Sequence, residues 1–86
     1  MAKKVNMDKA DIEREVKEII AKQLNISSKG IKLTDSFAND LGIDSFGAAE
    51  LTFALKDKFK LEIPQTDLAN IRTVGDIVDY LTVKIL

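Results

Sequence analysis

The tripeptide Asp-Ser-Phe occurs twice in this chain, and each copy places a serine hydroxyl beside a carboxylate. The copies are Asp35-Ser36-Phe37 and Asp44-Ser45-Phe46, which begin nine residues apart. A serine that acts as a nucleophile on its own needs an adjacent base, most often histidine. The chain contains no His and no Cys, which excludes Ser-His and Cys-His sites, disulfides and His-ligated zinc. We therefore expect no catalytic residue, no metal site and no independent enzyme.

The size and charge of the chain narrow the remaining function classes. Its 86 residues are enough for one small domain, residues 1–86, with a thin core. The formal net charge is −1, and no basic cluster is interleaved with aromatic residues, so we expect no nucleic-acid partner. No apolar run approaches the roughly 18 residues that cross a bilayer, and neither "MAKK" nor the following "DKADIEREVKE" contains the apolar stretch of a signal peptide. We expect a cytoplasmic monomer.

The apolar residues recur with helical spacing over most of the sequence. One stripe lies in residues 8–24, a long helix is predicted from residue 44 or 45 to about residue 59, a brief one in residues 65–71, and another stripe follows Thr73. Thr73 and Asp76 have the spacing of a capping box. The pattern predicts an all-α fold, a small four-helix bundle with three main helices, a short third helix and a long loop between helices one and two. Five apolar residues are expected to hold this loop on the core: Ile26, Ile31, Leu33, Phe37 and Leu41.

The two serines have different surroundings in this scheme. In the first copy, Thr34 or Asp35 can cap one helical turn that Gly42 closes in a left-handed conformation, so Ser36 needs no further role. Ser45 is predicted to be the N-cap or a first-turn residue of the long helix, which explains it structurally. The free N–H groups at a helix start also favour a phosphate. A phosphate ester at Ser45 would therefore be helped by the helix.

The long helix has two apolar faces instead of one. One face contains Ala48, Leu51, Leu55 and Phe59, and the other contains Phe46, Ala49 and Phe53. Two interpretations remain open: a central helix packed on several sides, or a helix with one core face and one face for a partner or apolar ligand. Residues 33–55 contain no Lys or Arg, and an acidic patch of Asp35, Asp40, Asp44 and Glu50 surrounds the helix start. This patch could neutralise the helix dipole or attract a basic partner.

The segment "DLGIDSFGAAELTFALKDKFKLEIP" resembles the acyl carrier protein signature, in which a Leu-Gly-x-Asp-Ser motif opens the second helix of a four-helix domain. The likeness extends over nearly the whole chain, including "TVGDIVDYL" at the start of the fourth helix. It implies that Ser45 carries a 4′-phosphopantetheine arm, transferred from coenzyme A by a separate phosphopantetheinyl transferase. Acyl groups would be held as thioesters on the thiol of that arm, in fatty acid, lipid or polyketide biosynthesis.

The resemblance also implies roles for other residues of the long helix. Asp44 and Glu50 match the family's acidic contacts with synthases and acyltransferases, and Phe46, Ala49 and Phe53 match its apolar contacts. The acyl chain would lie between the helices, against Leu51, Leu55 and Ile71. The chain departs from carriers of ordinary fatty acid synthesis at Phe46, Gly47 and Ala49 and in the lysines Lys56, Lys58 and Lys60. These departures indicate a specialised carrier. The alternatives are an unmodified helical interaction module and a peptidyl or aminoacyl carrier of the nonribosomal-peptide type.

Overall fold

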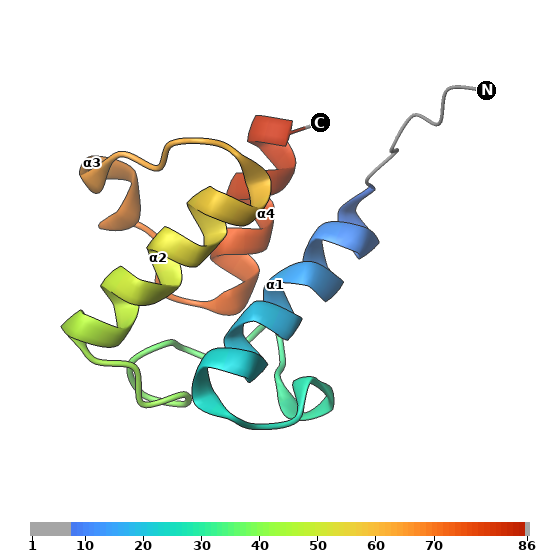
Figure 1. Cartoon of the computed structure of the whole chain (residues 1–86), viewed down its shortest axis with the longest axis vertical. Helices are drawn as coiled ribbons and strands as arrows, with labels where there is room; N and C mark the ends of the chain where they lie inside the picture. Colours follow the sequence, from blue (N-terminus) through green and yellow to red (C-terminus); the bar gives the residue numbers. More distant parts are fainter. Residues whose placement is uncertain (1–7, 86) are drawn as a thin grey trace.

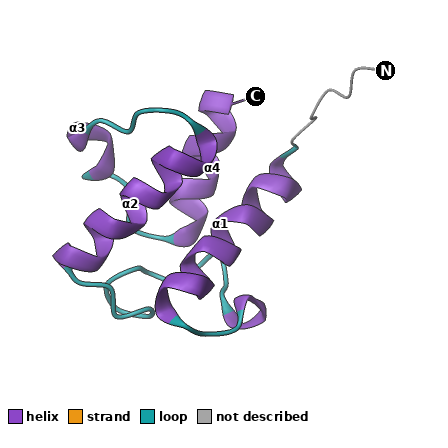
Figure 2. Ribbon diagram, viewed as in Figure 1, coloured by secondary structure: helices purple, strands orange, loops and turns teal. Residues whose placement is uncertain are grey.

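The computed structural model describes residues 8–85, and these residues form a bundle of helices joined by loops (Figures 1 and 2). The elements are α1 (Lys9–Leu24), the single-turn 3₁₀ helix η1 (Ser28–Gly30), α2 (Ser45–Phe59), α3 (Gln65–Leu68) and α4 (Val74–Ile85). This confirms the predicted all-α fold with three main helices and a short third one. Residues 1–7, on which part of the signal-peptide prediction rests, lie outside the described part of the chain. Within residues 8–85, no helix combines the length and apolar character needed to cross a membrane.

The boundaries of α1 and α4 are set by local capping. Asp8 accepts a hydrogen bond from the backbone N–H of Asp11 at 3.0 Å, and the Asp11 carboxylate accepts from the Asp8 N–H at 3.2 Å. Thr73 and Asp76 form the same reciprocal pair at the start of α4, at 3.1 Å in each direction. Such pairs satisfy backbone donors that a helix start leaves without partners. The capping box predicted at Thr73 is confirmed.

The core lies where α1 packs against α2 and α4. α1 and α4 supply most of it, and α2 contributes Leu51 and Leu55. Seven side chains are almost entirely removed from solvent: Ile12, Val16, Ile20, Val74, Ile77, Val78 and Leu81. Burial of each such aliphatic side chain contributes roughly 1.5–3 kcal/mol. The bundle therefore rests on the two predicted stripes that lie before and after the long loop and α2.

The loop of residues 25–44 is held by backbone hydrogen bonds to the start of α4 and by part of its apolar side chains. The N–H of Phe37 donates to Arg72 O at 2.9 Å, and the N–H of Gly75 donates to Leu33 O at 2.8 Å. The predicted apolar attachment is partly wrong. Ile31 is buried, and Phe37 and Leu41 pack against the core, but Ile26 and Leu33 are 47% and 37% exposed. The backbone pairing fixes this part of the loop without their burial.

The first Asp-Ser-Phe copy forms turns that include the predicted single helical turn, since the Asp40 N–H donates to Ser36 O at 3.0 Å. The residue that caps this turn is Ser36, and not Thr34 or Asp35 as predicted. Ser36 itself stabilises these turns: its hydroxyl oxygen accepts from the Asn39 N–H at 2.7 Å, and its N–H donates to the Asp40 carboxylate at 2.7 Å. Asp35 instead accepts from the N–H of Lys32 at 2.9 Å. The prediction for Gly42 holds, because its φ of +66° is in the left-handed region that favours glycine.

The short helix α3 lies at the edge of the bundle opposite α1 (Figure 1). It has only four residues, and its N-cap is Pro64, which provides no side-chain hydrogen bond. Leu68 and, just beyond the helix, Ile71 pack against the core. The hydroxyl of Tyr80 on α4 donates to the Asp67 carboxylate at 2.5 Å. A few contacts thus hold α3 against the rest of the molecule.

Candidate functional site

The start of α2 presents Ser45 to solvent as the first residue of a well-capped helix. The carboxylate of Asp44 accepts from the Gly47 N–H at 2.8 Å, which makes Asp44 the N-cap. Ile43 before it is buried and holds the chain on the core. Ser45 is itself exposed. The capping work is done by Asp44, so the Ser45 hydroxyl is available for chemistry.

Gly47 connects this helix start to the end of α1 through its backbone carbonyl. The side-chain amide of Gln23 on α1 donates to the carbonyl of Gly47 at 2.8 Å. A Cβ at position 47 would meet Ile43 Cγ2 at 3.1 Å and Asp44 Oδ1 at 3.3 Å, which is tight packing. The lack of a side chain at position 47 thus leaves room for Ile43 and for the Asp44 carboxylate, which precede Ser45.

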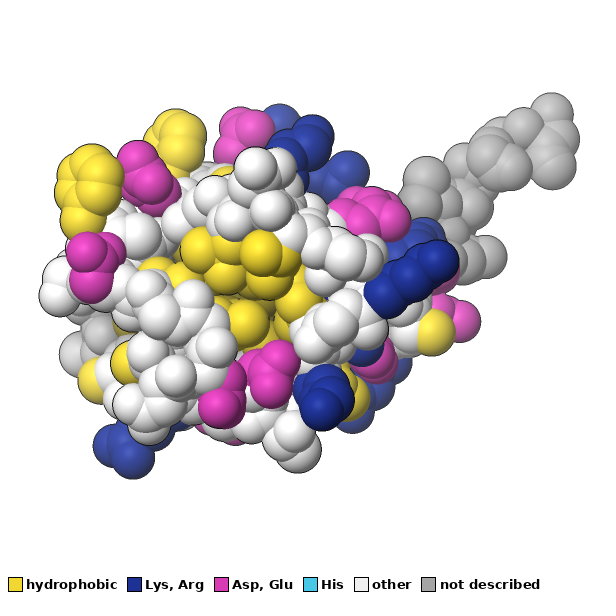
Figure 3. Space-filling view, turned by 90° about the horizontal axis from the view of Figure 1, so that it is seen from below, with side chains coloured by type: hydrophobic (Ala, Val, Ile, Leu, Met, Phe, Trp, Pro, Cys, Tyr) yellow, Lys and Arg dark blue, Asp and Glu magenta, His cyan; other side chains and the backbone are white. Residues whose placement is uncertain are grey.

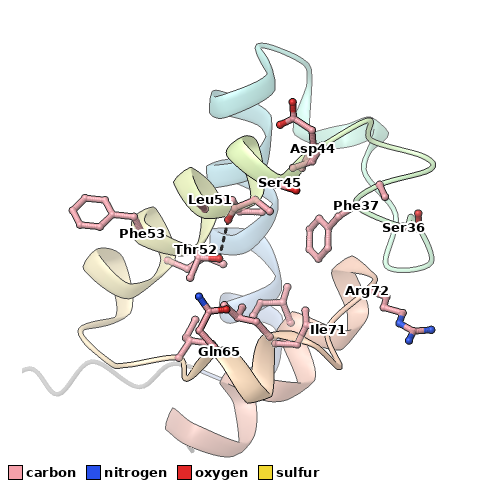
Figure 4. Close-up of a pocket in the computed structure, with 18 of the residues that line it drawn as sticks. Ser36, Phe37, Asp44, Ser45, Leu51, Thr52, Phe53, Gln65, Ile71 and Arg72 are labelled. Carbon is pink, nitrogen blue, oxygen red and sulfur yellow. Dashed lines mark hydrogen bonds between the residues drawn. The ribbon is translucent and has the colours of Figure 1, made fainter.

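A cavity of about 890 Å³ opens beside Ser45 and extends between α2, α3 and the loop that precedes α2 (Figure 4). Ser45 and Asp44 lie among its lining residues. All three residues predicted to contact an acyl chain, Leu51, Leu55 and Ile71, line it as well. The structure therefore joins the Ser45 hydroxyl to a partly apolar space in the bundle.

The side of α2 next to the cavity carries an exposed apolar stripe. Phe46 and Phe53, seven residues apart on the helix, are each 72% exposed, and Ala49 between them is exposed too. Phe53 borders the rim of the cavity, and its ring points outward (Figure 4). This arrangement decides between the two interpretations of the double-faced helix, because a helix packed on several sides would have buried these rings.

Three of the four carboxylates in the predicted acidic patch also accept backbone hydrogen bonds. Asp35 and Asp40 accept backbone hydrogen bonds within the loop, and Asp44 caps α2. Asp44 and Glu50 are exposed on α2. Figure 3 shows a face on which hydrophobic side chains gather in a hollow bordered by acidic ones. The predicted partner residues Asp44, Phe46, Ala49, Glu50 and Phe53 are all accessible on this one helix.

Two of the lysines that distinguish α2 form ion pairs with neighbouring parts of the chain. Lys58 Nζ lies 3.3 Å from Glu15 Oε1 on α1, and Lys56 Nζ lies 3.4 Å from Glu62 Oε1. Exposed pairs of this kind contribute little to stability, typically up to about 1 kcal/mol. They reduce the free positive charge at the C-terminal end of α2.

Comparison with known proteins matches this arrangement to a carrier family. The family model for the phosphopantetheine attachment site matches residues 14–81. The acyl carrier protein of Wolinella succinogenes is 42% identical over 67 residues, which cover 78% of this chain and 88% of that protein. The chain belongs to the acyl carrier protein family. Proteins of this family hold a covalently attached 4′-phosphopantetheine and are substrates of phosphopantetheinyl transferases, so the chain is a carrier and not an enzyme.

Solved structures of carrier proteins share the fold. The solution structure of a candidate acyl carrier protein from Anaplasma phagocytophilum has a TM-score of 0.83 and 27% identity, covering 96% of this chain and 98% of that one. The crystal structure of a free-standing peptidyl carrier protein from an Acinetobacter baumannii secondary metabolic pathway has a TM-score of 0.80 and 27% identity, covering 94% and 100%. The bundle with its long first loop is thus the carrier fold.

Three residues around the site were not identified from the sequence. Gln23 reaches Gly47 from α1, while Thr52 and Gln65 line the cavity. Thr52 could have been found, because it lies seven residues after Ser45 and so falls on the same side of a helix. No local pattern marks Gln23 or Gln65, since both act across the gap between helices.

Proposed function

We propose that Ser45 is the attachment site of the phosphopantetheine arm in this acyl carrier protein. The observation that carries the proposal is the exposed Ser45 at the start of α2, inside the matched family region and beside the cavity. Free N–H groups and the helix dipole favour a phosphate there, although Asp44 and Glu50 oppose part of its charge. Ser36 is the less suitable serine, because its hydroxyl oxygen already accepts a hydrogen bond that holds a turn.

In the attachment reaction Ser45 is the acceptor. Its Oγ forms a bond to phosphorus as the bond between that phosphorus and the adenylate side of coenzyme A breaks, and the serine proton passes to a base. The described residues bring no histidine or cysteine to Ser45, and the chain contains neither. We therefore assign the base to the transferase. The chain contributes a fixed helix end and an accessible hydroxyl.

The loaded acyl group has a sheltered place in the cavity beside Ser45. Leu51 and Leu55 are 5% and 2% exposed, and Ile71 lies across from them on the segment after α3. Apolar surface buried there favours binding by about 25 cal/mol per Å². We infer that these three side chains contact the acyl chain and reduce its contact with water between visits to enzymes.

Docking of partner enzymes is assigned to the exposed apolar stripe of α2. Phe46, Ala49 and Phe53 offer exposed apolar area, and Asp44 and Glu50 offer negative charge next to it. Aromatic side chains with a charged rim are typical of binding surfaces. We propose that synthases and acyltransferases with a basic patch dock here, and that the carrier acts as a monomer in the cytoplasm.

The type of cargo is inferred from the relative with the higher sequence identity. The acyl carrier protein of Wolinella succinogenes is 42% identical, whereas the peptidyl carrier structure is 27% identical. We therefore propose acyl cargo, in fatty acid, lipid or polyketide biosynthesis, with Phe46, Gly47 and Ala49 marking a specialised carrier. A peptidyl or aminoacyl carrier is the second candidate, and the shared fold supports it.

The test is intact mass after incubation with coenzyme A, magnesium and a broad-specificity phosphopantetheinyl transferase. The parent chain, Ser45→Ala and Ser36→Ala are treated side by side. One phosphopantetheine is expected on the parent and on Ser36→Ala, and none on Ser45→Ala. A gain that persists in Ser45→Ala would contradict the assignment. No gain on the parent with any transferase would favour an unmodified interaction module.

A further inference from the structure

One side of α2 leads from Ser45 along the cavity and carries a polar group part-way. Ser45, Ala48 and Thr52 all line the cavity and are spaced by three and four residues, so they follow one helix face. Seven residues of helix correspond to about 10 Å along its axis. An acyl group that enters beside Ser45 and follows this face therefore passes the small Ala48 and then meets Thr52.

Thr52 presents a hydrogen-bond acceptor to the cavity. Its hydroxyl donates to the carbonyl of Ala48 at 2.8 Å, so its proton is committed to the helix. The hydroxyl oxygen keeps lone pairs that can accept from another group. The side chain is half-buried, which limits its contact with water. A bound group with an O–H donor would satisfy this oxygen.

Gln65 faces Thr52 from the other wall. It is the first residue of α3, lines the same cavity, and its carboxamide points toward Thr52 in Figure 4. Within residues 8–85, no hydrogen bond to another residue engages this carboxamide, although the comparable amide of Gln23 donates at 2.8 Å. The carboxamide offers two N–H donors and an acceptor oxygen. The two walls thus present complementary polar groups above an apolar floor.

We propose that Thr52 and Gln65 make this carrier selective for acyl chains that bear a hydroxyl group. A hydroxyl can donate to Thr52 Oγ1 and accept from the Gln65 amide at once. A plain alkyl chain can do neither and displaces the water that would otherwise satisfy both groups. A keto oxygen can only accept, so it engages Gln65 and leaves Thr52 without a donor. This inference rests on the proposed function, because the chain must be tethered at Ser45.

The test compares how well the cavity protects different acyl chains on the loaded carrier. A transferase attaches octanoyl-phosphopantetheine, or analogues hydroxylated at successive odd carbons of the chain, and intact mass verifies loading. The rate at which added hydroxylamine cleaves the thioester then reports how well the cavity shelters the acyl chain, because a chain held in the cavity keeps its thioester from the reagent. Failure to load would count against the proposed function, whereas the selectivity is judged only on loaded protein.

Three variants distinguish the effect of Thr52 and Gln65 from a general effect of substitution on the protein. Gln65→Leu and Thr52→Val remove the polar groups, and Thr82→Val is the matched control. Thr82 donates to its own helix at 2.7 Å in the same way as Thr52, but it does not line the cavity. The measured quantity is the protection of the thioester from hydroxylamine, expressed as the ratio of a hydroxylated chain to octanoyl. For at least one hydroxylated chain, we expect this ratio to fall about two- to ten-fold in Gln65→Leu and Thr52→Val. The Thr82→Val ratio should equal that of the parent.

The use of a ratio cancels differences in intrinsic thioester reactivity. If the ratio is the same in the parent and in Gln65→Leu for every hydroxylated chain, the proposal is overturned. An equal fall in Thr82→Val would also overturn it. Gln65 is exposed, so its replacement leaves the core intact. As an independent readout, the NMR signals of the Gln65 side-chain amide should shift with the protected hydroxylated chain and not with octanoyl.

Discussion

The side-chain amide of Gln23 lies 2.8 Å from the carbonyl oxygen of Gly47, and this hydrogen bond joins the end of α1 to the first turn of α2. It fixes the helix start only two residues beyond Ser45. A side chain at Gly47 would crowd Ile43 and Asp44, the two residues that lead into this helix start. The position of Ser45 therefore depends on a contact between residues that are distant in sequence.

Replacement of Gln23 tests this contact. Gln23→Ala should lower the free energy of unfolding by roughly 0.5–1.5 kcal/mol, because one intramolecular hydrogen bond is lost. Urea unfolding followed by far-ultraviolet circular dichroism measures it. Lys22→Ala, on the same helix turn and exposed, is the control and should change stability by no more than about 0.5 kcal/mol. Equal effects of the two changes would argue against a role of the hydrogen bond.

The two roles of Asp44 can be separated by two substitutions. Asp44→Asn retains a good N-cap and should change stability by only a few tenths of a kcal/mol, whereas Asp44→Ala should cost about 1 kcal/mol. Both remove the negative charge, so both should raise the KM of the transferase if the charge guides docking. Unfolding and steady-state kinetics are measured on the same samples. A normal KM for Asp44→Asn would show that Asp44 acts only as a cap.

The exposed aromatic stripe should matter for docking and hardly for folding. Phe46→Ala and Phe53→Ala are expected to change the free energy of unfolding by no more than about 0.5 kcal/mol, since both rings are 72% exposed. The KM of the transferase should rise about ten-fold for at least one of them. Val83→Ala, which removes an apolar side chain that is 80% exposed on α4, should leave the KM unchanged.

A substitution in the core shows the loss of stability that Phe46→Ala and Phe53→Ala should not cause. Leu55→Ala should cost roughly 2–5 kcal/mol, because Leu55 is 2% exposed and its removal leaves a cavity. If Phe46→Ala or Phe53→Ala destabilised the chain by a comparable amount, these rings would be part of the core and the assignment of the docking face would be wrong.

The single tyrosine reports directly on how α3 is held. The hydrogen bond that Tyr80 donates to Asp67, together with partial burial and the nearby carboxylate charge, raises the pKa of Tyr80 to about 12 from an ordinary 10.0. The chain has one Tyr and no Trp, so near-ultraviolet absorbance follows this phenol alone. Asp67→Asn removes the charge, and the pKa of Tyr80 should move back toward its ordinary value.

This raised pKa has a defined consequence for stability. The folded state favours the neutral phenol, so the stabilisation is fully present below pH 10 and is lost as the pH rises through about 12. The parent should therefore lose stability between these pH values, and Tyr80→Phe should lose less over the same range. Urea unfolding at a series of alkaline pH values makes the comparison. Equal losses in the two chains would contradict the hydrogen bond.

The sequence by itself determined the helices and most of their ends, and it singled out Ser45 as the candidate attachment site. Helical spacing and the pair Thr73 and Asp76 act over three or four residues, so they are readable without knowledge of distant neighbours. The motif around Ser45 is equally local. The first Asp-Ser-Phe copy shows the limit of such reading. There Ser36 forms the turn through local hydrogen bonds, but the backbone pairing of Phe37 with Arg72, 35 residues later, decides where the loop lies against the start of α4.

The tertiary structure decided which faces and side chains meet. Two apolar faces on α2 look alike in sequence, and only the packing of α2 against α1 decides which of them is buried and leaves Phe46 and Phe53 in solvent. Thr52 and Gln65 come to face one another because the chain turns back after α2 and places the start of α3 on the other side of the cavity (Figure 4). Such pairings depend on how separate helices pack, and no short-range spacing encodes them. The sequence thus singled out the candidate serine, and the packing of the bundle formed the cavity beside it.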